Sequence, residues 1–132
     1  MNATTDCIFC KIANQSIPVE LVHSDEQCVA FRDIHPQAPT HLLVIPRKHV
    51  RDLVEVTDTS GAGASDEGQE KMAGCDALLG HLLRVATQAA QKVGLHADGF
   101  RVVINTGANA GQSVFHLHLH VLGGRSLGWP PG

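Results

Sequence analysis

The sequence predicts an α+β domain in which a mainly antiparallel sheet of about five strands carries one long helix on one face. Residues 115–121 alternate between apolar residues and histidines, as a strand does when one of its faces lies on a core. Between Cys75 and Val93, apolar residues recur every three or four positions, which is the period of an amphipathic helix. Short apolar runs bounded by turn residues predict the other strands, at residues 19–23, 28–34, 42–45 and 100–105.

The chain of 132 residues is expected to form a single domain, residues 1–132, that buries about two thirds of its unfolded surface. Its formal charge of -3 and the absence of any run of Lys or Arg argue against a nucleic-acid-binding surface or an anionic membrane as a partner. No apolar stretch reaches the ~18 residues of a membrane span, and the first residues do not resemble a signal peptide. We therefore expect a cytoplasmic protein, also compatible with the nucleus, whose four cysteines are reduced.

A short helical turn is expected at residues 7–12, where Cys7 and Cys10 form a C-x-x-C pair. The two cysteines are either small buried hydrophobic residues or metal ligands, and the pair alone would supply only two ligands. The strands at 19–23 and 28–34 follow, joined by a polar turn. Asp33, at the outward-facing end of the second strand, is by default an acid that caps the following loop.

Prolines predict a loop at residues 35–39, and the uninterrupted apolar run at 42–45 predicts a central strand buried on both faces. His41 stands just before this strand. Residues 57–76 begin with Gly, Ser and Thr and are expected to form a surface loop, with helix-capping candidates at 65–67. The long helix should follow and end near Gly94.

The histidine-rich strand would place three imidazoles on one face, from His116, His118 and His120. The other face would be apolar and would lie on the core through Phe115, Leu117, Leu119 and Val121. Such a cluster is a solvated surface, a metal site, or a site for chemistry on a phosphate, and the spacing alone does not separate the last two. The preceding residues 105–113 are rich in Gly and in amide and hydroxyl donors, which suits a loop that approaches a phosphate.

The run at residues 111–122, Gly-Gln-Ser-Val-Phe-His-Leu-His-Leu-His-Val-Leu, resembles the signature of the histidine triad (HIT) superfamily. The ending, Gly-Gly-Arg at 123–125 and Trp-Pro-Pro-Gly at 129–132, is similar to the HINT branch of nucleotide-binding proteins. Further similarities lie at 31–34, 37–41 and 44–49. Residues 57–76 depart from the pattern and therefore count as an insertion.

The resemblance implies a HIT-like fold with a site for a purine nucleoside monophosphate. His118 is implied to be the catalytic nucleophile, which forms a nucleotidyl-histidine that water then hydrolyses. His120 and Ser113 are implied to contact the phosphate or the leaving group, and His41 to fix the tautomer of a neighbouring histidine. Asp33 would hold the ribose hydroxyls, and the base would lie among Ile8, Phe9, Ile12, Phe31 and Ile34. The remaining nucleotide contacts are implied to be Asn105, Gly111, Gln112, Val114 and Trp129.

The resemblance also implies a structural Zn²⁺ held by two cysteines and two histidines, namely Cys7, Cys10, His49 and His116. The chemistry itself would need no cofactor. A further implication is a homodimer in which two sheets join edge to edge into one continuous sheet. The C-terminal tail, residues 123–132, would then cross to the partner and place Trp129 in its leaving-group pocket.

These features predict a phosphoramidase that hydrolyses nucleoside 5′-phosphoramidates such as adenosine 5′-monophosphoramidate. No Lys or Arg is evident at the site, which suits a singly charged phosphoryl group better than a polyphosphate. Two alternatives remain open. One is a dinucleoside polyphosphate hydrolase of the same superfamily, and the other is a non-catalytic module that binds nucleotide or zinc.

Overall fold

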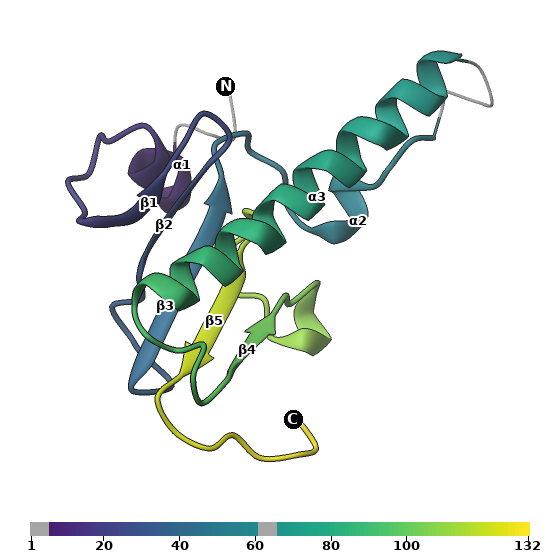
Figure 1. Ribbon diagram of the computed structural model, residues 1–132. Helices are drawn as coiled ribbons and strands as arrows, with labels where there is room; N and C mark the ends of the chain where they lie inside the picture. Colours follow the sequence, from purple (N-terminus) through teal and green to yellow (C-terminus); the bar gives the residue numbers. More distant parts are fainter. Residues whose placement is uncertain (1–5, 61–65) are drawn as a thin grey trace.

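The computed structural model of the chain describes residues 6–60 and 66–132 and contains a five-stranded sheet (Figure 1). Its strand order is β1-β2-β3-β5-β4, and every neighbouring pair is antiparallel. The strands are β1 (Leu21–Ser24), β2 (Cys28–Arg32), β3 (Thr40–Pro46), β4 (Phe100–Val103) and β5 (Leu119–Gly123). The predicted α+β class and antiparallel five-stranded sheet are therefore confirmed.

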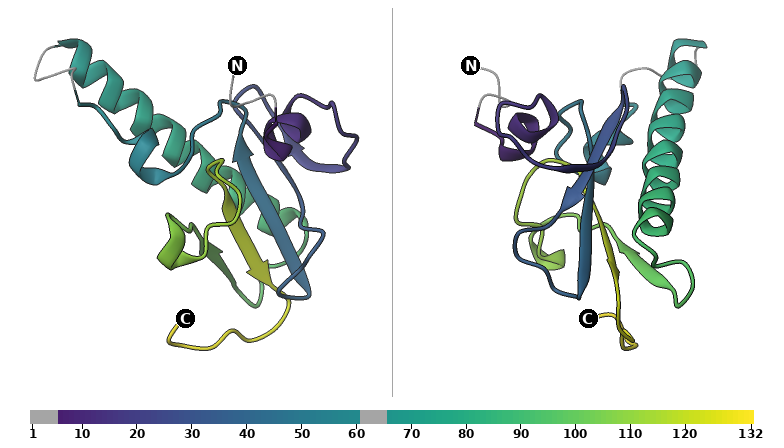
Figure 2. Two further views of the ribbon diagram at one scale, coloured as in Figure 1. Left: turned by 180° about the vertical axis from the view of Figure 1, so that it is seen from behind. Right: turned by 60° about the vertical axis from the view of Figure 1, so that its left-hand side comes forward.

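Helices cover the two faces of the sheet unequally (Figure 2). The long helix α3 (Asp66–Lys92) crosses one face, while the short α1 (Ile8–Ala13) lies on the other. A single turn, α2 (Leu53–Val56), precedes α3. No helix within residues 6–60 and 66–132 is long and apolar enough to cross a membrane.

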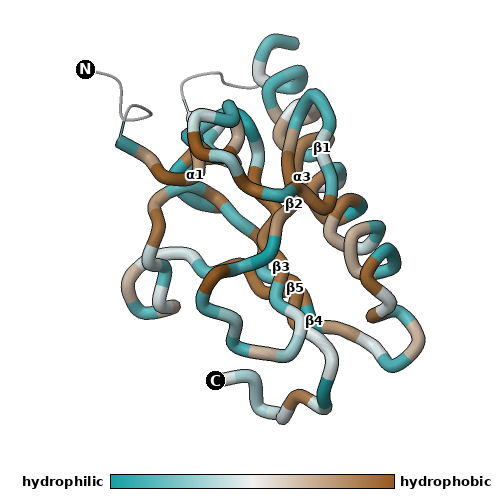
Figure 3. Tube along the Cα trace, turned by 90° about the vertical axis from the view of Figure 1, so that its left-hand side faces the viewer, coloured by the Kyte–Doolittle hydropathy of each residue, from teal (hydrophilic) through white to brown (hydrophobic). Residues whose placement is uncertain are grey.

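The core is divided into two clusters by the sheet. Leu42, Val44 and Leu82 belong to the larger cluster, between the sheet and α3. Phe9, Phe31 and Leu43 belong to the smaller one, between the sheet and α1. Strand β3 contributes to both clusters and is buried along almost its whole length, as its uninterrupted apolar run predicted. Figure 3 shows the alternation of hydrophobic and hydrophilic residues along α3 that fits it to this position.

The long helix begins earlier than its apolar period indicated. The structure places Asp66 at its first position, which agrees with the helix-capping candidates at 65–67, whereas the expected surface loop is wrong for residues 66–76, which are helical. The early turns carry few apolar residues and extend beyond the sheet (Figure 1), which is why hydrophobic periodicity does not reveal them. The helix starts with acidic Asp66 and Glu67, which favour the positive end of a helix dipole. Residues 61–65, part of the expected insertion, lie outside the described residues.

The histidine-rich segment is only partly a strand. Pairing with β3 starts at Leu119, opposite Val44, because β3 ends at Pro46, which has no N–H to donate. Leu117 instead donates its N–H to the carbonyl of Val50, at 2.7 Å. Leu117, Leu119 and Val121 are buried beneath α3 as expected, but the chain bends before them. Phe115 is consequently 56% exposed, so its expected place in the core is wrong.

The packing of α3 can be tested with two neighbouring leucines. Leu82 is fully buried against the sheet, whereas Leu83 is 48% exposed. Leu82→Ala should lower the free energy of unfolding by about 2–5 kcal/mol, because it leaves a cavity in the larger cluster. Leu83→Ala is the matched control and should change it by less than about 1 kcal/mol. Equal losses in urea denaturation of the two variants would contradict this packing.

Candidate functional site

The three clustered histidines separate into two sites. His118 and His120 line a cavity of about 510 Å³ on the α1 side of the sheet. Their ring centroids are 4.9 Å apart. His116 is fully buried and directs its Nδ1 toward Cys7 and Cys10 instead. The three imidazoles therefore lie on one side of the sheet, but His116 faces the two cysteines while His118 and His120 face the cavity.

The cavity unites most of the residues expected at a nucleotide site. Its apolar part is formed by α1 and by the end of β2, with Phe9 packed edge-on against Phe31 at a centroid distance of 5.8 Å. Ile34 is 86% exposed and can contribute only at the rim. The lining includes these expected residues: Ile8, Phe9, Ile12, Phe31, Asp33, Ile34, His41, Ser113, Val114, His118 and His120.

His118 has a defined tautomer. Its Nδ1 lies 2.7 Å from the carbonyl oxygen of His116, which can only accept, so Nδ1 carries the proton. Burial lowers the pKa of His118, although the bond to His116 and the charge of Asp33 act in the opposite direction. The ring is therefore neutral near pH 7, and its Nε2 keeps a lone pair. This arrangement presents an unprotonated imidazole nitrogen as a nucleophile.

His120 has the opposite tautomer, and the cause is a backbone group of Gln37. The N–H of Gln37 donates to Nδ1 of His41 at 3.0 Å, so the proton of His41 is on Nε2. That Nε2 lies 2.9 Å from Nδ1 of His120, which must accept. The proton of neutral His120 is therefore on its own Nε2. This N–H is buried and has no partner within the part of the chain that the structure describes.

Asp33 stands between the loop and these histidines. One carboxylate oxygen accepts from the N–H of His35 at 2.9 Å, which makes Asp33 the cap of its loop. The other oxygen lies 3.4 Å from Nε2 of His41. Asp33 also lines the cavity, so the capping role and a role toward a ligand are compatible.

The Gly-rich loop is organised by Gln112. Its side-chain oxygen accepts from the N–H of Gly107 at 2.9 Å, and its amide donates to the carbonyls of Arg51 and Val114. Gln112 is buried and its side chain is committed to this loop rather than directed at the cavity. Gly107 and Gly111 have positive φ angles of 83° and 84°, which explains why glycine occupies both positions.

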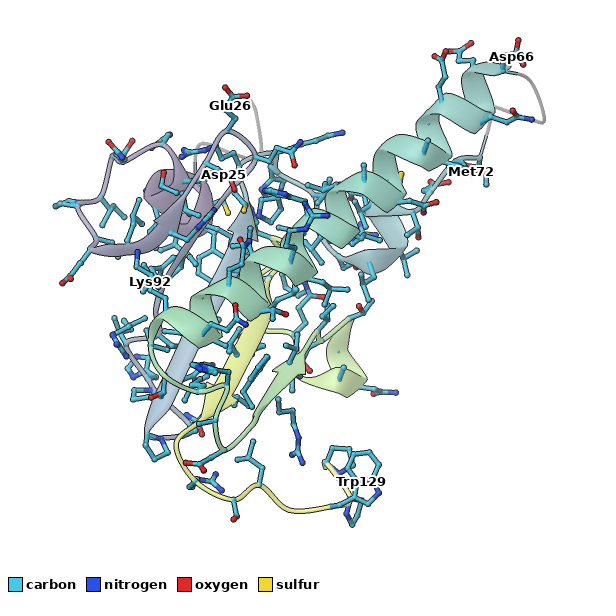
Figure 4. The ribbon with its side chains drawn as sticks, viewed as in Figure 1. Asp25, Glu26, Asp66, Met72, Lys92 and Trp129 are labelled. Carbon is cyan, nitrogen blue, oxygen red and sulfur yellow. The ribbon has the colours of Figure 1, made fainter. Side chains whose placement is uncertain are left out.

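Other expected contacts lie outside the cavity. Asn105, Gly111 and Gln112 are absent from its lining, and so is Trp129, which is 82% exposed. Trp129 stands near the end of the tail (Figure 4). The Arg101 guanidinium lies 6.0 Å from its ring centroid. Within one chain, the structure therefore does not bring these four residues together with His118.

The four expected metal ligands do meet. The two thiol sulfurs and the Nδ1 atoms of both histidines lie within 4.8 Å of one another: Cys7, Cys10, His49 and His116. The Cys10–His49 pair is 3.3 Å apart and the two Nδ1 atoms are 3.2 Å apart. A tetrahedral ion with bonds of about 2.1 Å to nitrogen and 2.3 Å to sulfur would separate its ligands by about 3.4–3.8 Å. The group can therefore hold a metal ion.

The groups around this cluster favour the binding of a cation. Nε2 of His116 lies 2.8 Å from the carbonyl oxygen of Pro46, so it carries the proton and leaves Nδ1 free to coordinate. Burial, together with the adjacent Cys7, raises the pKa of the Cys10 thiol to about 11. A positive ion would stabilise the thiolate that burial disfavours.

Comparison with known proteins agrees with the geometry. A family model described as the HIT domain matches residues 14–127. The chain belongs to the HIT domain family. A HIT-like protein of Synechococcus elongatus, which carries the description uncharacterized, is 48% identical over 127 residues, or 96% of this chain and 97% of that one. A HIT-like protein of Synechocystis, also described as uncharacterized, has the same identity and coverage.

Solved HIT structures share the fold. A HIT family hydrolase from Legionella pneumophila is 44% identical, with a TM-score of 0.77, and the match covers 96% of this chain and all of that one. A histidine triad protein from Clostridium difficile has a TM-score of 0.77 at 38% identity, with 97% of both chains covered. The HIT-like fold and the relation to HIT family hydrolases are thus established.

The HIT cavity of this chain also contains residues that the sequence analysis missed. Arg32 lines it, which corrects the expectation that no Lys or Arg is present. Arg32 ends β2 directly after the buried Phe31, and alternation along the strand would place it on the opposite face, so the sequence pattern did not indicate this position. The other additions depend on how loops fold over the sheet, and they are Ile17, Val19, His35, Gln37 and Leu43.

The partly buried, neutral state of His120 predicts a pH dependence of stability. Burial lowers its pKa to about 4 in the folded protein, from 6.5 in an unfolded chain. Between these values the unfolded state binds a proton that the folded state does not, so stability decreases as pH falls. His120 should account for about 1–2 kcal/mol of the loss between pH 7 and pH 5.

Denaturation of His120→Gln at both pH values measures this contribution. The variant should lose less stability than the wild type by that amount, whereas His96→Gln, at an exposed position, should behave like the wild type. Parallel losses in the wild type and in His120→Gln would show that His120 is not buried as the neutral form.

Proposed function

We propose that this protein is a purine nucleotide-binding phosphoramidase that cleaves nucleoside 5′-phosphoramidates through a nucleotidyl-histidine intermediate on His118. The observation that carries this proposal is the bond from Nδ1 of His118 to the carbonyl of His116, which leaves Nε2 as a nucleophile at the cavity. Membership of a family that includes proteins described as hydrolases supports a catalytic role.

The cavity suits a nucleoside. A planar base fits against the apolar wall made by Phe9, Ile12 and Phe31, which would bury much of its surface. The carboxylate of Asp33 stands beside this wall and would accept hydrogen bonds from the ribose hydroxyls. The phosphate would then lie toward the histidines and Ser113, on the same lining.

His118 and His120 would have different roles in the reaction. Nε2 of His118 attacks the phosphorus, and the bond from phosphorus to the leaving nitrogen breaks as this nitrogen takes up a proton from solvent, which the later attack of water returns. The unpartnered Nε2–H of His120 donates a hydrogen bond to a phosphoryl oxygen as charge develops there. Ser113 is exposed at the cavity mouth and donates to the leaving nitrogen. Water then attacks the same phosphorus and releases His118.

The preference for a phosphoramidate rests on the weak positive charge of the cavity. Among its described lining residues, Arg32 is the single Lys or Arg, and it follows Phe31 at the base end. The phosphate end offers neutral donors, which suits one phosphoryl group better than a polyphosphate.

A specific feature keeps the dinucleoside polyphosphate hydrolase as the second candidate. A hollow of about 670 Å³ adjoins the cavity at Ile8, Ser113 and Val114, and it is large enough for a bulky leaving group. A panel that compares nucleoside phosphoramidates with diadenosine polyphosphates separates the two. Faster hydrolysis of the polyphosphates would select this alternative, and nucleotide binding without turnover of either class would leave a regulatory module.

His118→Ala should reduce turnover of adenosine 5′-monophosphoramidate by at least about a thousandfold, because the nucleophile is lost. Binding of AMP should be retained, since the apolar wall and Asp33 are unchanged. His35→Ala, which removes an exposed imidazole at the same cavity, is the matched control and should keep most of the activity. Acid-quenched wild-type enzyme with labelled substrate should carry label on His118. Label on another histidine would contradict the assignment.

We infer that the ion suited to Cys7, Cys10, His49 and His116 is a structural Zn²⁺. Two thiolates and two imidazoles form a closed tetrahedral set with no position for substrate. When bound, the ion would fix His116, whose carbonyl in turn holds His118. Its contribution would therefore be positional rather than chemical.

Cys10→Ser should lower the Zn²⁺ content by about one ion per chain and reduce the melting temperature by about 5 °C or more. Cys75→Ser is the control, because the Cys75 thiol donates to the carbonyl of Val56 and does not belong to the cluster. Metal analysis and thermal unfolding of both variants provide the comparison. Unchanged zinc content in Cys10→Ser would leave Cys7 and Cys10 as packing residues.

We further propose a homodimer formed through β4, in which the tail at residues 123–132 reaches the partner's site. All four residues of β4 are partly exposed, and within the described residues this strand pairs only with β5. Arg101 on β4 donates to the carbonyl of Gly128 at 2.7 Å and so holds the tail beside this edge. Joining two such edges would place the exposed Trp129 on the neighbouring subunit.

Trp129→Ala should change the preference among leaving groups more than the affinity for AMP, because the ring would contact the leaving group. Removal of residues after Arg125 should lower turnover while it spares β5, in which Gly123 pairs with Thr40. Kinetics with several amine leaving groups and light scattering test the two parts. A monomer at micromolar concentration would exclude the dimer, and an unaltered substrate profile would exclude the role of Trp129.

A further inference from the structure

A second group of potential metal ligands lies on the opposite face of the sheet from the nucleotide cavity. His23 of β1, Asp25 of the following turn and Cys28 of β2 have ligand atoms within 4.8 Å of one another. His81 reaches the same carboxylate from α3. Cys28 packs in the cluster beneath α3, whereas the nucleotide cavity is lined from the α1 side. We propose that His23, Asp25, Cys28 and His81 form a second site for a divalent transition metal of the Zn²⁺ class.

The carboxylate of Asp25 is held in position by the backbone. One of its oxygens accepts from the N–H groups of Gln27 and Cys28, at 2.7 and 2.9 Å. Arg47 donates to the backbone carbonyl of Asp25 at 2.7 Å and fixes the turn. Figure 4 shows where Asp25 lies. These bonds leave the second oxygen directed at the two histidines and the thiol.

Three side chains converge on that second oxygen. Nε2 of His23 lies at 2.7 Å, Nε2 of His81 at 2.8 Å and Sγ of Cys28 at 3.6 Å. A tetrahedral ion would separate a carboxylate oxygen from imidazole nitrogens by about 3.3 Å and from a thiolate by about 3.5 Å. Outward shifts of about half an ångström in the two partly exposed histidines would therefore make room for an ion, and His81, which is not in the group whose ligand atoms all lie within 4.8 Å of one another, would also have to turn toward His23 and Cys28.

The ligand types favour a borderline transition metal. Two imidazoles and a thiolate suit Zn²⁺ or Co²⁺, whereas Mg²⁺ and Ca²⁺ prefer oxygen ligands. The carboxylate is ionised: burial alone would raise its pKa, but hydrogen bonds from His23, Gln27, His81 and Cys28 outweigh burial and hold the pKa of Asp25 well below its usual range. The side chains of His23, Asp25 and His81 remain about a quarter exposed, so an ion can enter.

Binding would connect three separate elements. The ion would link the turn between β1 and β2 to the middle of α3, which now meet through the hydrogen bonds to Asp25. Because metal would displace the proton of the Cys28 thiol, its affinity should rise with pH. A bound ion should also raise the melting temperature of the protein.

Titration of the full chain with Zn²⁺ and Co²⁺ tests the proposal. In the Cys7→Ser, Cys10→Ser double variant, which lacks the first cluster, about one ion per chain should still bind. Co²⁺ bound there should show a thiolate charge-transfer band that Cys28→Ser abolishes. His81→Ala and His23→Ala should each weaken metal binding at least tenfold, because each variant loses a ligand. Loss of a group that only hydrogen-bonds to a ligand already costs about that much. His96→Ala, at an exposed position elsewhere, should have no effect.

The outcome is independent of the first metal site and of the catalytic proposal. If the double variant does not fold, the wild type decides: its melting temperature should rise on addition of Zn²⁺ by more than that of His81→Ala, which keeps the first cluster complete and lacks one ligand of the second. Metal binding and melting temperature that respond to Cys10→Ser but not to His23→Ala, Cys28→Ser or His81→Ala would overturn the second site. Hydrogen bonding alone would then account for the convergence on Asp25.

Discussion

The hydrogen bond between Nδ1 of His118 and the carbonyl of His116 is the contact on which the rest of the site depends. It orients the imidazole and leaves its Nε2 unprotonated. The same His116 extends its side chain to Cys7 and Cys10 and donates to the carbonyl of Pro46, so its backbone cannot shift freely. The cluster of potential metal ligands and the proposed nucleophile are therefore parts of one structural unit.

A second constraint gives the neighbouring imidazole the complementary property. The backbone N–H of Gln37 fixes His41, and His41 fixes His120, so that His120 offers an N–H where His118 offers a lone pair. Burial lowers the pKa of His41, His118 and His120 and keeps the three rings neutral near pH 7. The positions of their protons are therefore preserved. One attacking atom and one donor beside it would suit the phosphoryl transfer that we propose for a cavity with little positive charge.

The spacing of apolar residues in the sequence predicted the sheet, the amphipathic part of α3 and the apolar wall of the cavity. Burial of one face of a strand or helix imposes a period on that spacing. The apolar period did not reach the first turns of α3, where polar residues such as Glu67 and Glu70 lie beyond the core, although capping candidates at 65–67 indicated its start. The same spacing placed Phe115 in the core, since nothing in the alternation shows that pairing stops at Pro46. Two further features depend on tertiary contacts and became visible only in the structure. The Gln112 side chain is hydrogen-bonded within the protein and not directed at the cavity, and Arg32 lines the cavity.

The most direct test of the histidine arrangement is nitrogen-15 NMR of histidine-labelled protein at pH 7, in which long-range couplings identify the protonated nitrogen of each ring. We predict that His118 is protonated on Nδ1 and bare at Nε2, and that His120 is protonated on Nε2 and bare at Nδ1. Gln112→Ala, which disturbs the loop without touching either ring, should leave both tautomers unchanged. The opposite tautomer at His118, or imidazolium at either ring, would contradict the account.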